Sequence, residues 1–339
     1  MNHFTVDCLI AGAGMAGLTA ARILQAQGLN VVVLDKGRGI GGRLATRWSD
    51  NDAGVRARYD HGAQFFTVRD VSFQTHVDDW LARGLVKEWA RGFAGASGQP
   101  HHDGHPRYCA VHGMNSLAHD LARDLAVTTS ARVNRISPQE QGWRVTMAMG
   151  DHHTAASILL TPPVEQSLAL LDAGETILAD DTRAALERIS YDPCLALLVE
   201  LDAPSRLPEP GAVQLRGDPL AQPLVWIGDN HRKGISPDAF TVTLHAGPEF
   251  TREHWEAPDD VIAQRLLQAA NDWLGVPVRR WHVHRWRYSQ PVVTHPDACL
   301  FTTQPAPLAF AGDAFGSSRL EGAFLSGRAA AHLLLKVMR

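Results

Sequence analysis

The sequence predicts an α/β fold in which a doubly wound, parallel-sheet domain is discontinuous and carries an inserted α+β domain. Three observations lead to this prediction. Residues 4–35 follow a strand–helix–strand pattern, and residues 307–337 return to the same style. Between them, short strands alternate with Pro/Gly turns, as in a mixed or antiparallel sheet. A chain of 339 residues is long enough for about two domains.

The first half of the chain opens with buried strands at 4–11 and 30–35 around a helix at 15–27. A loop at 36–47 follows, because its glycines and arginines suit no regular element. We expect further helices at 70–83 and 114–125, the second capped by Asn115 or Ser116. Strands are expected over 131–136, 142–147 and 156–161.

The second half changes style beyond Pro163. Its expected helices are 164–171, 181–188 and the amphipathic 258–273, and its expected strands are 194–201, 223–228, 240–247 and 278–289. The end of the chain resembles its beginning, with a strand at 307–312, a loop, and a helix at 323–337. The two ends therefore read as parts of one domain.

The amino-acid composition is that of a folded protein and argues against several functions. Hydrophobic residues make up 45% and charged residues 20%, which is typical of a folded globular chain. The formal net charge of −4 argues against a dedicated nucleic-acid binder. Four cysteines (Cys8, Cys109, Cys194, Cys299) form no CxxC pair, and the 17 histidines form no zinc-site pattern. We expect a reduced cytoplasmic protein without a bound metal.

The N-terminal segment shows neither an export signal nor a membrane span. Asp7 interrupts its apolar run and no basic region precedes it. The uncharged stretch 8–21 is shorter than the roughly 18 residues that a spanning helix needs. We therefore expect no membrane partner.

A dinucleotide-binding motif joins the first expected strand to the first helix. Gly12, Gly14 and Gly17 form a GxGxxG, whose glycines permit a tight turn, close approach of a diphosphate, and close packing of helix on strand. The helix N-terminus then faces the phosphates. Asp35 closes the second strand, where an acid accepts hydrogen bonds from an unphosphorylated ribose, as in FAD or NAD. Lys36 follows it and weakens the preference against a phosphorylated ribose.

Three further segments favour FAD over NAD. The glycine cluster 39–42 with Arg43 supplies a second contact for an extended cofactor, which a plain NAD domain does not need. The segment 59–66 reads as a strand that ends beside small residues, suited to a flat ring. Finally, Asp313 follows the strand 307–312, and residues 321–323 begin the last helix, whose N-terminus would stabilise negative charge on a reduced flavin.

At these residues the chain resembles the FAD-dependent amine oxidase superfamily, and within it the bacterial renalase-like flavoproteins. The resemblance covers the whole length and rests on GAGMAG, GGRLATR, DHGAQFFT, TPPVEQ, WRYSQ and the closing GDAF and EGAF. It implies a non-covalent FAD cofactor. It also implies an FAD-binding domain, to which we assign 1–67, 107–162 and 298–339, and a substrate-binding domain, 68–106 and 163–297.

The resemblance implies the cofactor residues position by position. Residues beside the diphosphate, ribose and ribityl groups would be Gly12, Gly14, Ala16, Gly17, Asp35, Lys36, Gly42 and Arg43. Ala63 and Gln64 would lie on the flavin side, and Val133 would meet the adenine through its backbone. Gly312, Asp313, Glu321, Gly322 and Ala323 would complete the site.

The flavin carries the redox chemistry, so no catalytic side chain is predicted. The sequence has no nucleophile elbow and no P-loop. Related amine oxidases usually place a lysine near flavin N5, and the only lysine here between 88 and 335 is Lys233, in an expected loop. The sequence has no redox-active cysteine pair, and the mid-chain strand where a hydroxylase would carry an Asp-Gly motif reads ASILLTPP instead. Both observations weaken the disulfide-reductase and hydroxylase interpretations.

The renalase resemblance implies a dihydronicotinamide dinucleotide as substrate, reduced at the 2- or 6-position. A hydride would pass to flavin N5, giving NAD(P)+, and dioxygen would reoxidise the flavin to give hydrogen peroxide. Trp286, Arg287 and Tyr288 are the expected substrate wall, because an aromatic face or a cation suits the nicotinamide or its phosphates.

Two other hypotheses stay open on the sequence. One is a flavin-dependent oxidase of amines or other small molecules on the same scaffold. The other is a non-enzymatic protein in which the flavin is structural. The sequence predicts no oligomeric state.

Overall fold

The structure is a computed structural model that describes residues 6–50, 54, 56–99, 101, 103–215 and 223–338. The chain divides into two compact units. Unit 1 comprises Met1–Arg43, Leu117–Tyr191 and Pro291–Arg339, and unit 2 comprises Leu44–Ser116 and Asp192–Gln290. Each unit has its own core.

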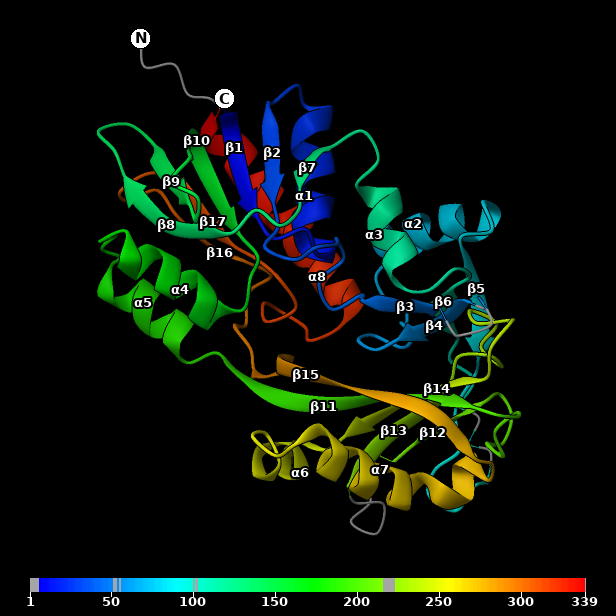
Figure 1. Ribbon diagram of the computed structural model, residues 1–339. Coiled ribbons are helices and arrows are strands. Elements are labelled where there is room, and N and C mark those ends of the chain that lie inside the picture. The colour runs from blue at the N-terminus through cyan, green and yellow to red at the C-terminus, as the bar shows by residue number, and fades with distance from the viewer. Residues whose placement is uncertain are drawn as a thin grey trace. The chain divides into compact units, whose positions relative to one another are not determined.

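Unit 1 is built on an eight-stranded mixed sheet (Figure 1). Its main path has the order β16-β17-β10-β1-β2-β7, and β9 and β8 extend it from β10. The strands are β1 (Val6–Ala11), β2 (Val31–Leu34), β7 (Ala126–Thr128), β8 (Val133–Pro138), β9 (Trp143–Met147), β10 (His152–Leu160), β16 (Leu300–Thr302) and β17 (Leu308–Phe310). β1 lies parallel to β2 and β10, and β10 lies parallel to β17. The chain's two ends therefore share one parallel sheet, which confirms the predicted doubly wound fold class.

The helices of unit 1 pack on this sheet or on one another. They are α1 (Met15–Ala26), α4 (Val164–Ala173), α5 (Asp180–Glu187) and α8 (Leu320–Met338). α8 packs directly on α1, because a Cβ at Gly327 would lie 2.1 Å from the carbonyl oxygen of Ala16. Apolar strand residues such as Leu9, Ile158 and Phe310 form the core beneath.

Unit 2 contains a five-stranded sheet of order β12-β13-β14-β11-β15 and two small hairpins. Its strands are β3 (Thr46–Asp50), β4 (Arg56–Asp60), β5 (Val86–Ala90), β6 (Arg107–Ala110), β11 (Ser190–Leu201), β12 (Ala212–Gln214), β13 (Leu224–Asp229), β14 (Thr241–Ala246) and β15 (Val278–Val293). β11 and β15 begin or end in unit 1. Antiparallel pairing of β12, β13, β14 and β11 confirms the predicted sheet type.

The helices of unit 2 are α2 (Val71–Ala82), α6 (Pro248–Glu253) and α7 (Asp259–Leu274). α7 lies along the five-stranded sheet (Figure 1). Its Ile262, Leu266 and Leu274 are buried in the core of unit 2. α3 (Asn115–Leu121) spans the border of the two units. It is shorter than the expected 114–125, because the chain turns after Leu121 and Asp124 has a φ of 65°. Asn115 and Ser116 are its first residues, so neither is its N-cap.

Most expected elements are found within two or three residues, and the differences are local. Residues 4–5 of the first expected strand lie outside the described residues. The expected strand at 59–66 is wrong beyond Asp60, where β4 ends. The β3–β4 hairpin, β5, β6, β7, β12, β16 and α6 were not predicted, because they are short or carry polar side chains on both faces.

The compact units do not coincide with the domain boundaries expected from the sequence. Segments 44–67 and 107–116 belong to unit 2, and 163–191 and 291–297 belong to unit 1. The assignment of FAD binding to one domain and substrate binding to another stays a prediction.

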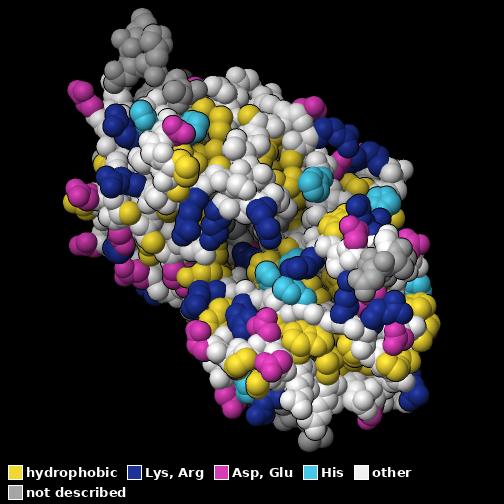
Figure 2. All heavy atoms as spheres, in the orientation of Figure 1, with side chains coloured by type: hydrophobic (Ala, Val, Ile, Leu, Met, Phe, Trp, Pro, Cys, Tyr) yellow, Lys and Arg dark blue, Asp and Glu magenta, His cyan; other side chains and the backbone are white. Residues whose placement is uncertain are grey.

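On the face shown in Figure 2, acidic and basic side chains are interspersed. Among the described residues, the helices lack the length and hydropathy needed to cross a membrane.

Candidate functional site

The first glycine loop of unit 1 forms a narrow cradle at the start of α1. Gly12 has a φ of 104°, and a Cβ there would lie 2.3 Å from Thr161 Oγ1. A Cβ at Gly17 would lie 2.1 Å from the carbonyl oxygen of Gly12, so α1 approaches β1 as closely as backbone allows. Gly14 caps α1 without a side-chain hydrogen bond, and the first turn has no acid. The first-turn N–H groups and the helix dipole are therefore available to an anion.

The second glycine cluster lies beside this cradle. Gly41 donates its N–H to the carbonyl of Ala13 at 2.8 Å and forms an isolated bridge with Gly14. Gly42 has a φ of 55°, and a Cβ there would lie 3.7 Å from Gly14 Cα. The glycines of two loops thus meet at one end of the sheet and leave backbone N–H groups accessible, which fits a diphosphate group.

Asp35 connects the end of β2 to the cradle. Its Oδ2 accepts the Ala13 N–H at 2.8 Å, and its Oδ1 accepts the Gly37 N–H at 2.7 Å. Each carboxylate oxygen has a second lone pair with which to accept a ribose hydroxyl. Lys36 donates to Gln166 Oε1 at 2.6 Å, and burial, with the nearby charge of Arg132, lowers its pKa.

An ion pair joins the two segments of unit 1 that were expected beside the ribityl chain. Arg43 Nη2 lies 2.5 Å from Asp313 Oδ1, although the two residues are 270 positions apart. The Arg43 guanidinium also lies over the ring of Tyr191, 6.0 Å from its centroid. The structure therefore brings the GGR loop and the GD motif together.

The remaining predicted residues of unit 1 lie on elements that frame these loops. Gly312 has a φ of 143°, and its N–H bonds to Ser326 Oγ at 2.8 Å. Glu321, Gly322 and Ala323 form the first turn of α8, where Gly322 packs on the Ser317 carbonyl. Ala16 lies in α1 below α8, and Val133 begins β8.

In unit 2, the chain leaves the sheet at the segment expected to face the flavin. β4 ends at Asp60, and residues 61–65 have irregular backbone. Gln64 is 6% exposed, and its Nε2 donates to the Asp60 carbonyl at 2.6 Å. Its buried Oε1 has no hydrogen-bond partner among the described residues, which fits a ligand on that side. Ala63, half-buried, lies just before it.

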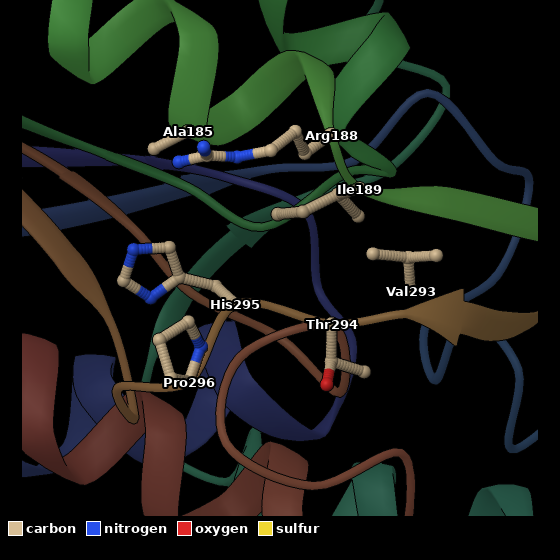
Figure 3. A pocket seen from close by; sticks show the side chains of 7 residues that line it. All are labelled: Ala185, Arg188, Ile189, Val293, Thr294, His295 and Pro296. Carbon is tan, nitrogen blue, oxygen red and sulfur yellow. The ribbon is translucent and has the colours of Figure 1, made fainter.

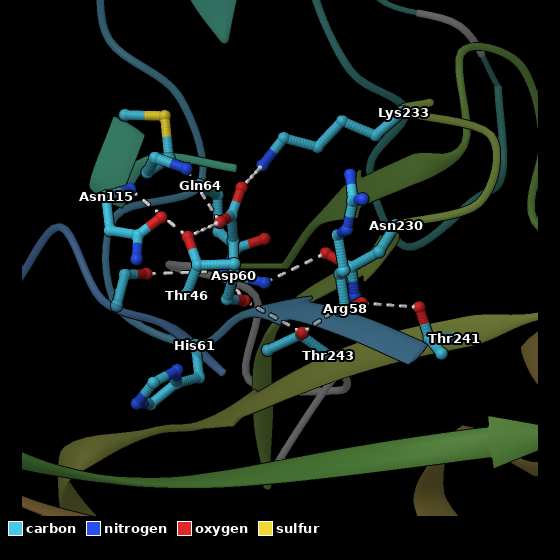
Figure 4. A network of polar contacts seen from close by, with 12 residues as sticks. Thr46, Arg58, Asp60, His61, Gln64, Asn115, Asn230, Lys233, Thr241 and Thr243 are labelled. Atoms are coloured by element: carbon cyan, nitrogen blue, oxygen red, sulfur yellow. Dashed lines mark hydrogen bonds and ion pairs between the residues drawn. The ribbon is translucent and has the colours of Figure 1, made fainter. Parts of the chain in front are cut away.

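A buried ion pair fixes this segment (Figure 4). Lys233 Nζ lies 2.5 Å from Asp60 Oδ2, and the two side chains are 1% and 0% exposed. Asp60 Oδ1 accepts from Thr46 Oγ1 at 2.6 Å and from the Met114 N–H at 2.8 Å. The Asp60 carbonyl accepts from Thr243 Oγ1 at 2.9 Å. Side chain and backbone of Asp60 are thus both held, and Lys233 is fully engaged.

His61 and Trp286 form a small aromatic cluster with His284. The His61 and Trp286 rings stack with centroids 5.4 Å apart, and His284 meets both rings edge-on. Trp286 Nε1 donates to the His61 carbonyl at 2.9 Å. Burial, with the neighbouring histidines and Arg47, lowers the pKa of His61 to about 3, and burial with His282 and Arg47 lowers that of His284 to about 4. Both rings are neutral at pH 7.

The three residues expected to form the substrate wall do not lie together. Side chains alternate along β15, so Trp286 and Tyr288 lie on one face and Arg287 on the other. The Arg287 guanidinium lies over the Trp255 ring, 4.9 Å from its centroid. The structure therefore separates Arg287 from the other two.

A separate cavity of about 330 Å3 lies in unit 1 (Figure 3). Its lining consists of Ala185, Arg188, Ile189, Val293, Thr294, His295 and Pro296, none of which was expected in the cofactor site. Within the part of the chain that the structure describes, no group of three or more His, Cys, Asp or Glu side chains is arranged to hold a metal ion.

Three features of unit 2 were missed from the sequence. They are the Asp60–Lys233 pair, the buried His61, and Arg47, whose Nη1 lies 2.7 Å from His282 Nε2. The alternation of His282, His284 and Trp286 along the expected strand was the one available signal, because it places all three on the same face.

Several solved structures have a similar fold. A putative protoporphyrinogen oxidase from Exiguobacterium sp. 255-15 superposes with a TM-score of 0.74 at 14% identity, over 98% of this chain and 99% of that one. A putrescine oxidase mutant gives a TM-score of 0.70 at 14% identity, with the same coverage. A fatty acid isomerase from P. acnes gives 0.70 at 13% identity, over 98% of each chain. These likenesses show the fold.

Sequence comparison identifies the family. Acetone monooxygenase (methyl acetate-forming) from Gordonia sp. (strain TY-5) is 31% identical over 151 residues, which are 44% of this chain and only 24% of that protein. Residues 10–83 match the NAD(P)-binding Rossmann-like domain. Residues 72–335 match the flavin containing amine oxidoreductases. The chain therefore belongs to the flavin containing amine oxidoreductase family.

Proposed function

We propose that this protein is a renalase-like oxidase that converts 2- or 6-dihydro isomers of NAD(P)H to NAD(P)+. When bound, FAD would accept a hydride at N5 and pass the electrons to dioxygen, giving hydrogen peroxide. The substrate loses a hydride and no N–H bond breaks, so the chain needs no general base. The residues of unit 1 described above would hold the cofactor non-covalently, and Ala63 and Gln64 of unit 2 would approach the flavin.

The proposal rests on the charges of the side chains that surround Trp286. The charged or titratable groups that shift the pKa values of His61 and His284 are histidines and Arg47, with no carboxylate among them. The buried Asp60 is paired with Lys233. A protonated amine would find no uncommitted acid in this cluster, whereas the uncharged ring of a dihydronicotinamide suits neutral, aromatic neighbours.

Lys233 also argues against the amine-oxidase alternative. That alternative expects a lysine close to flavin N5. Here the Lys233 ammonium is buried against Asp60 and lies 5.1 Å from the centroid of the Trp89 ring. It is therefore engaged within unit 2 and is not free to assist a reaction.

The deciding experiment is anaerobic mixing of the purified yellow protein with 2- or 6-dihydro-NAD, followed by absorbance. We expect the flavin band to bleach within seconds and to return, with stoichiometric hydrogen peroxide, when air is admitted. A panel of primary amines and polyamines serves as the comparison. Bleaching by amines but by neither dihydronicotinamide isomer would refute the proposal, and a flavin that no donor reduces would favour a structural role.

A further inference from the structure

Arg47 of β3 contacts the face of β15 that carries Trp286. It is an exposed residue of β3, and its Nη1 lies 2.7 Å from His282 Nε2. Among the described residues it has no carboxylate within ion-pair distance. By contrast, Arg280 of the same strand face binds Glu200 at 2.6 Å, and Arg56 of β4 binds Asp50 at 3.2 Å.

The contact with His282 leaves the positive charge of Arg47 uncompensated. A guanidinium only donates hydrogen bonds, so the His282 Nε2 must accept and must be unprotonated. Burial and the charge of Arg47 lower the pKa of His282 and outweigh the smaller opposing effect of Asp259, in agreement with a neutral ring. A neutral imidazole orients the guanidinium without neutralising it. Among the residues that the structure describes, Arg47 is thus a cation held in place without a carboxylate partner.

The spacing of side chains along β15 indicates how far Arg47 lies from the aromatic cluster. His282, His284 and Trp286 follow at every second residue, so the first and last are separated by about 13 Å along the strand. A ligand that covers this row needs an aromatic ring at one end and an anionic group several bonds away. A nicotinamide dinucleotide has this arrangement, because ribose separates its ring from its phosphates.

We propose that Arg47 binds a phosphate group of the substrate while the nicotinamide ring lies against Trp286. The inference rests on the proposed function and names the residue that would select a dinucleotide over a smaller donor. Arginine suits this role because its fork of N–H groups matches phosphate geometry. FAD also carries phosphates, but the glycine cradle of unit 1 provides for those, so we assign Arg47 to the substrate.

The test compares Arg47→Met with wild type. We expect the KM for dihydro-NAD to rise roughly 10- to 100-fold, as for one lost charge-assisted contact, with kcat little changed. The Kd of NAD+, titrated through the flavin absorbance and so independent of turnover, should rise by the same factor. Arg47→Lys should be intermediate. The dihydronicotinamide riboside, which lacks phosphate, should be oxidised equally well by wild type and Arg47→Met.

Arg56→Met is the matched control, because it removes an exposed arginine from the neighbouring strand and should change neither constant. Unchanged KM and Kd in Arg47→Met would overturn the inference while the proposed function stands. Loss of bound FAD from Arg47→Met and Arg47→Lys would also overturn it, because the phosphate would then be the cofactor's. A wild type that oxidises neither isomer would refute the proposed function, and the NAD+ titration would still decide whether Arg47 binds a dinucleotide.

Discussion

Single residues of unit 2 show why a motif can be read from sequence while its surroundings cannot. The DHGAQ segment is recognisable because its residues are contiguous. The Asp60–Lys233 ion pair that fixes this segment cannot be recognised from the sequence, because Lys233 is 173 positions from Asp60 and only the folded chain brings them together. A lysine in an expected loop gives no sign of burial, since charged side chains are mostly exposed.

Replacing Lys233 by Met should destabilise the protein strongly. The change leaves the Asp60 carboxylate buried without its counter-charge, which costs about 3–5 kcal/mol in the free energy of unfolding. Urea denaturation measures it, and Lys87→Met, at a half-buried lysine of β5, is the matched control. The double change Lys233→Met with Asp60→Asn should recover part of the loss. A loss below about 1 kcal/mol in the single variant would mean that the pair contributes no more than a surface ion pair.

At the scale of elements, the β1–α1–β2 unit was predictable almost to the residue, because its determinants are local. Gly12 and Gly17 must be glycine for the helix to approach the strand, and the acid follows within the same segment. The β3–β4 hairpin was not predictable, since TRWSD and RARYD place polar side chains on both faces. Arg287 was assigned by its neighbours in sequence, although alternation along β15 turns it to the opposite face.

Gly17→Ala should reduce cofactor binding without unfolding unit 1. The added Cβ would lie 2.1 Å from the Gly12 carbonyl, so α1 must shift away from β1. Overpacking of this kind costs about 1–3 kcal/mol, and a loss of that size in the contacts between α1 and the diphosphate would weaken FAD binding roughly 5- to 160-fold. The ratio of flavin to protein absorbance after dialysis measures it. Gly95→Ala, where a Cβ meets nothing within 4 Å, is the control. Equal FAD retention in the two variants would remove the cradle from the cofactor site.

At the scale of the whole molecule, the sequence predicted a discontinuous architecture but not its borders. Recognising that the first and last segments share a sheet required only their similar patterns. The borders depend on which segments pack together, and 163–191 pack with unit 1 although their pattern resembles the strand-rich middle of the chain. Packing partners of amphipathic helices such as α4 and α5 are not encoded in periodicity.

Stability of the whole protein should fall as the pH drops below about 6.5. His61 and His284 have folded pKa values of about 3 and about 4, whereas the unfolded residues titrate near 6.5. Between these values the unfolded state binds more protons, so acid favours unfolding, and above pH 6.5 this contribution is flat. Urea midpoints measured from pH 7 to pH 5 check it. In the variant His61→Gln/His284→Gln the slope should be shallower, and an equal slope would exclude these two rings as its source.

The packing of α8 on α1 has a consequence for biosynthesis. The helix that presents the diphosphate cradle leaves the ribosome long before the helix that packs on it through Gly327 on Ala16. The β17 strand that completes the parallel sheet also emerges late. Nascent chains must therefore carry an unfinished nucleotide fold while the residues between α1 and α8 are synthesised, and we expect the cofactor to enter only after synthesis has passed α8.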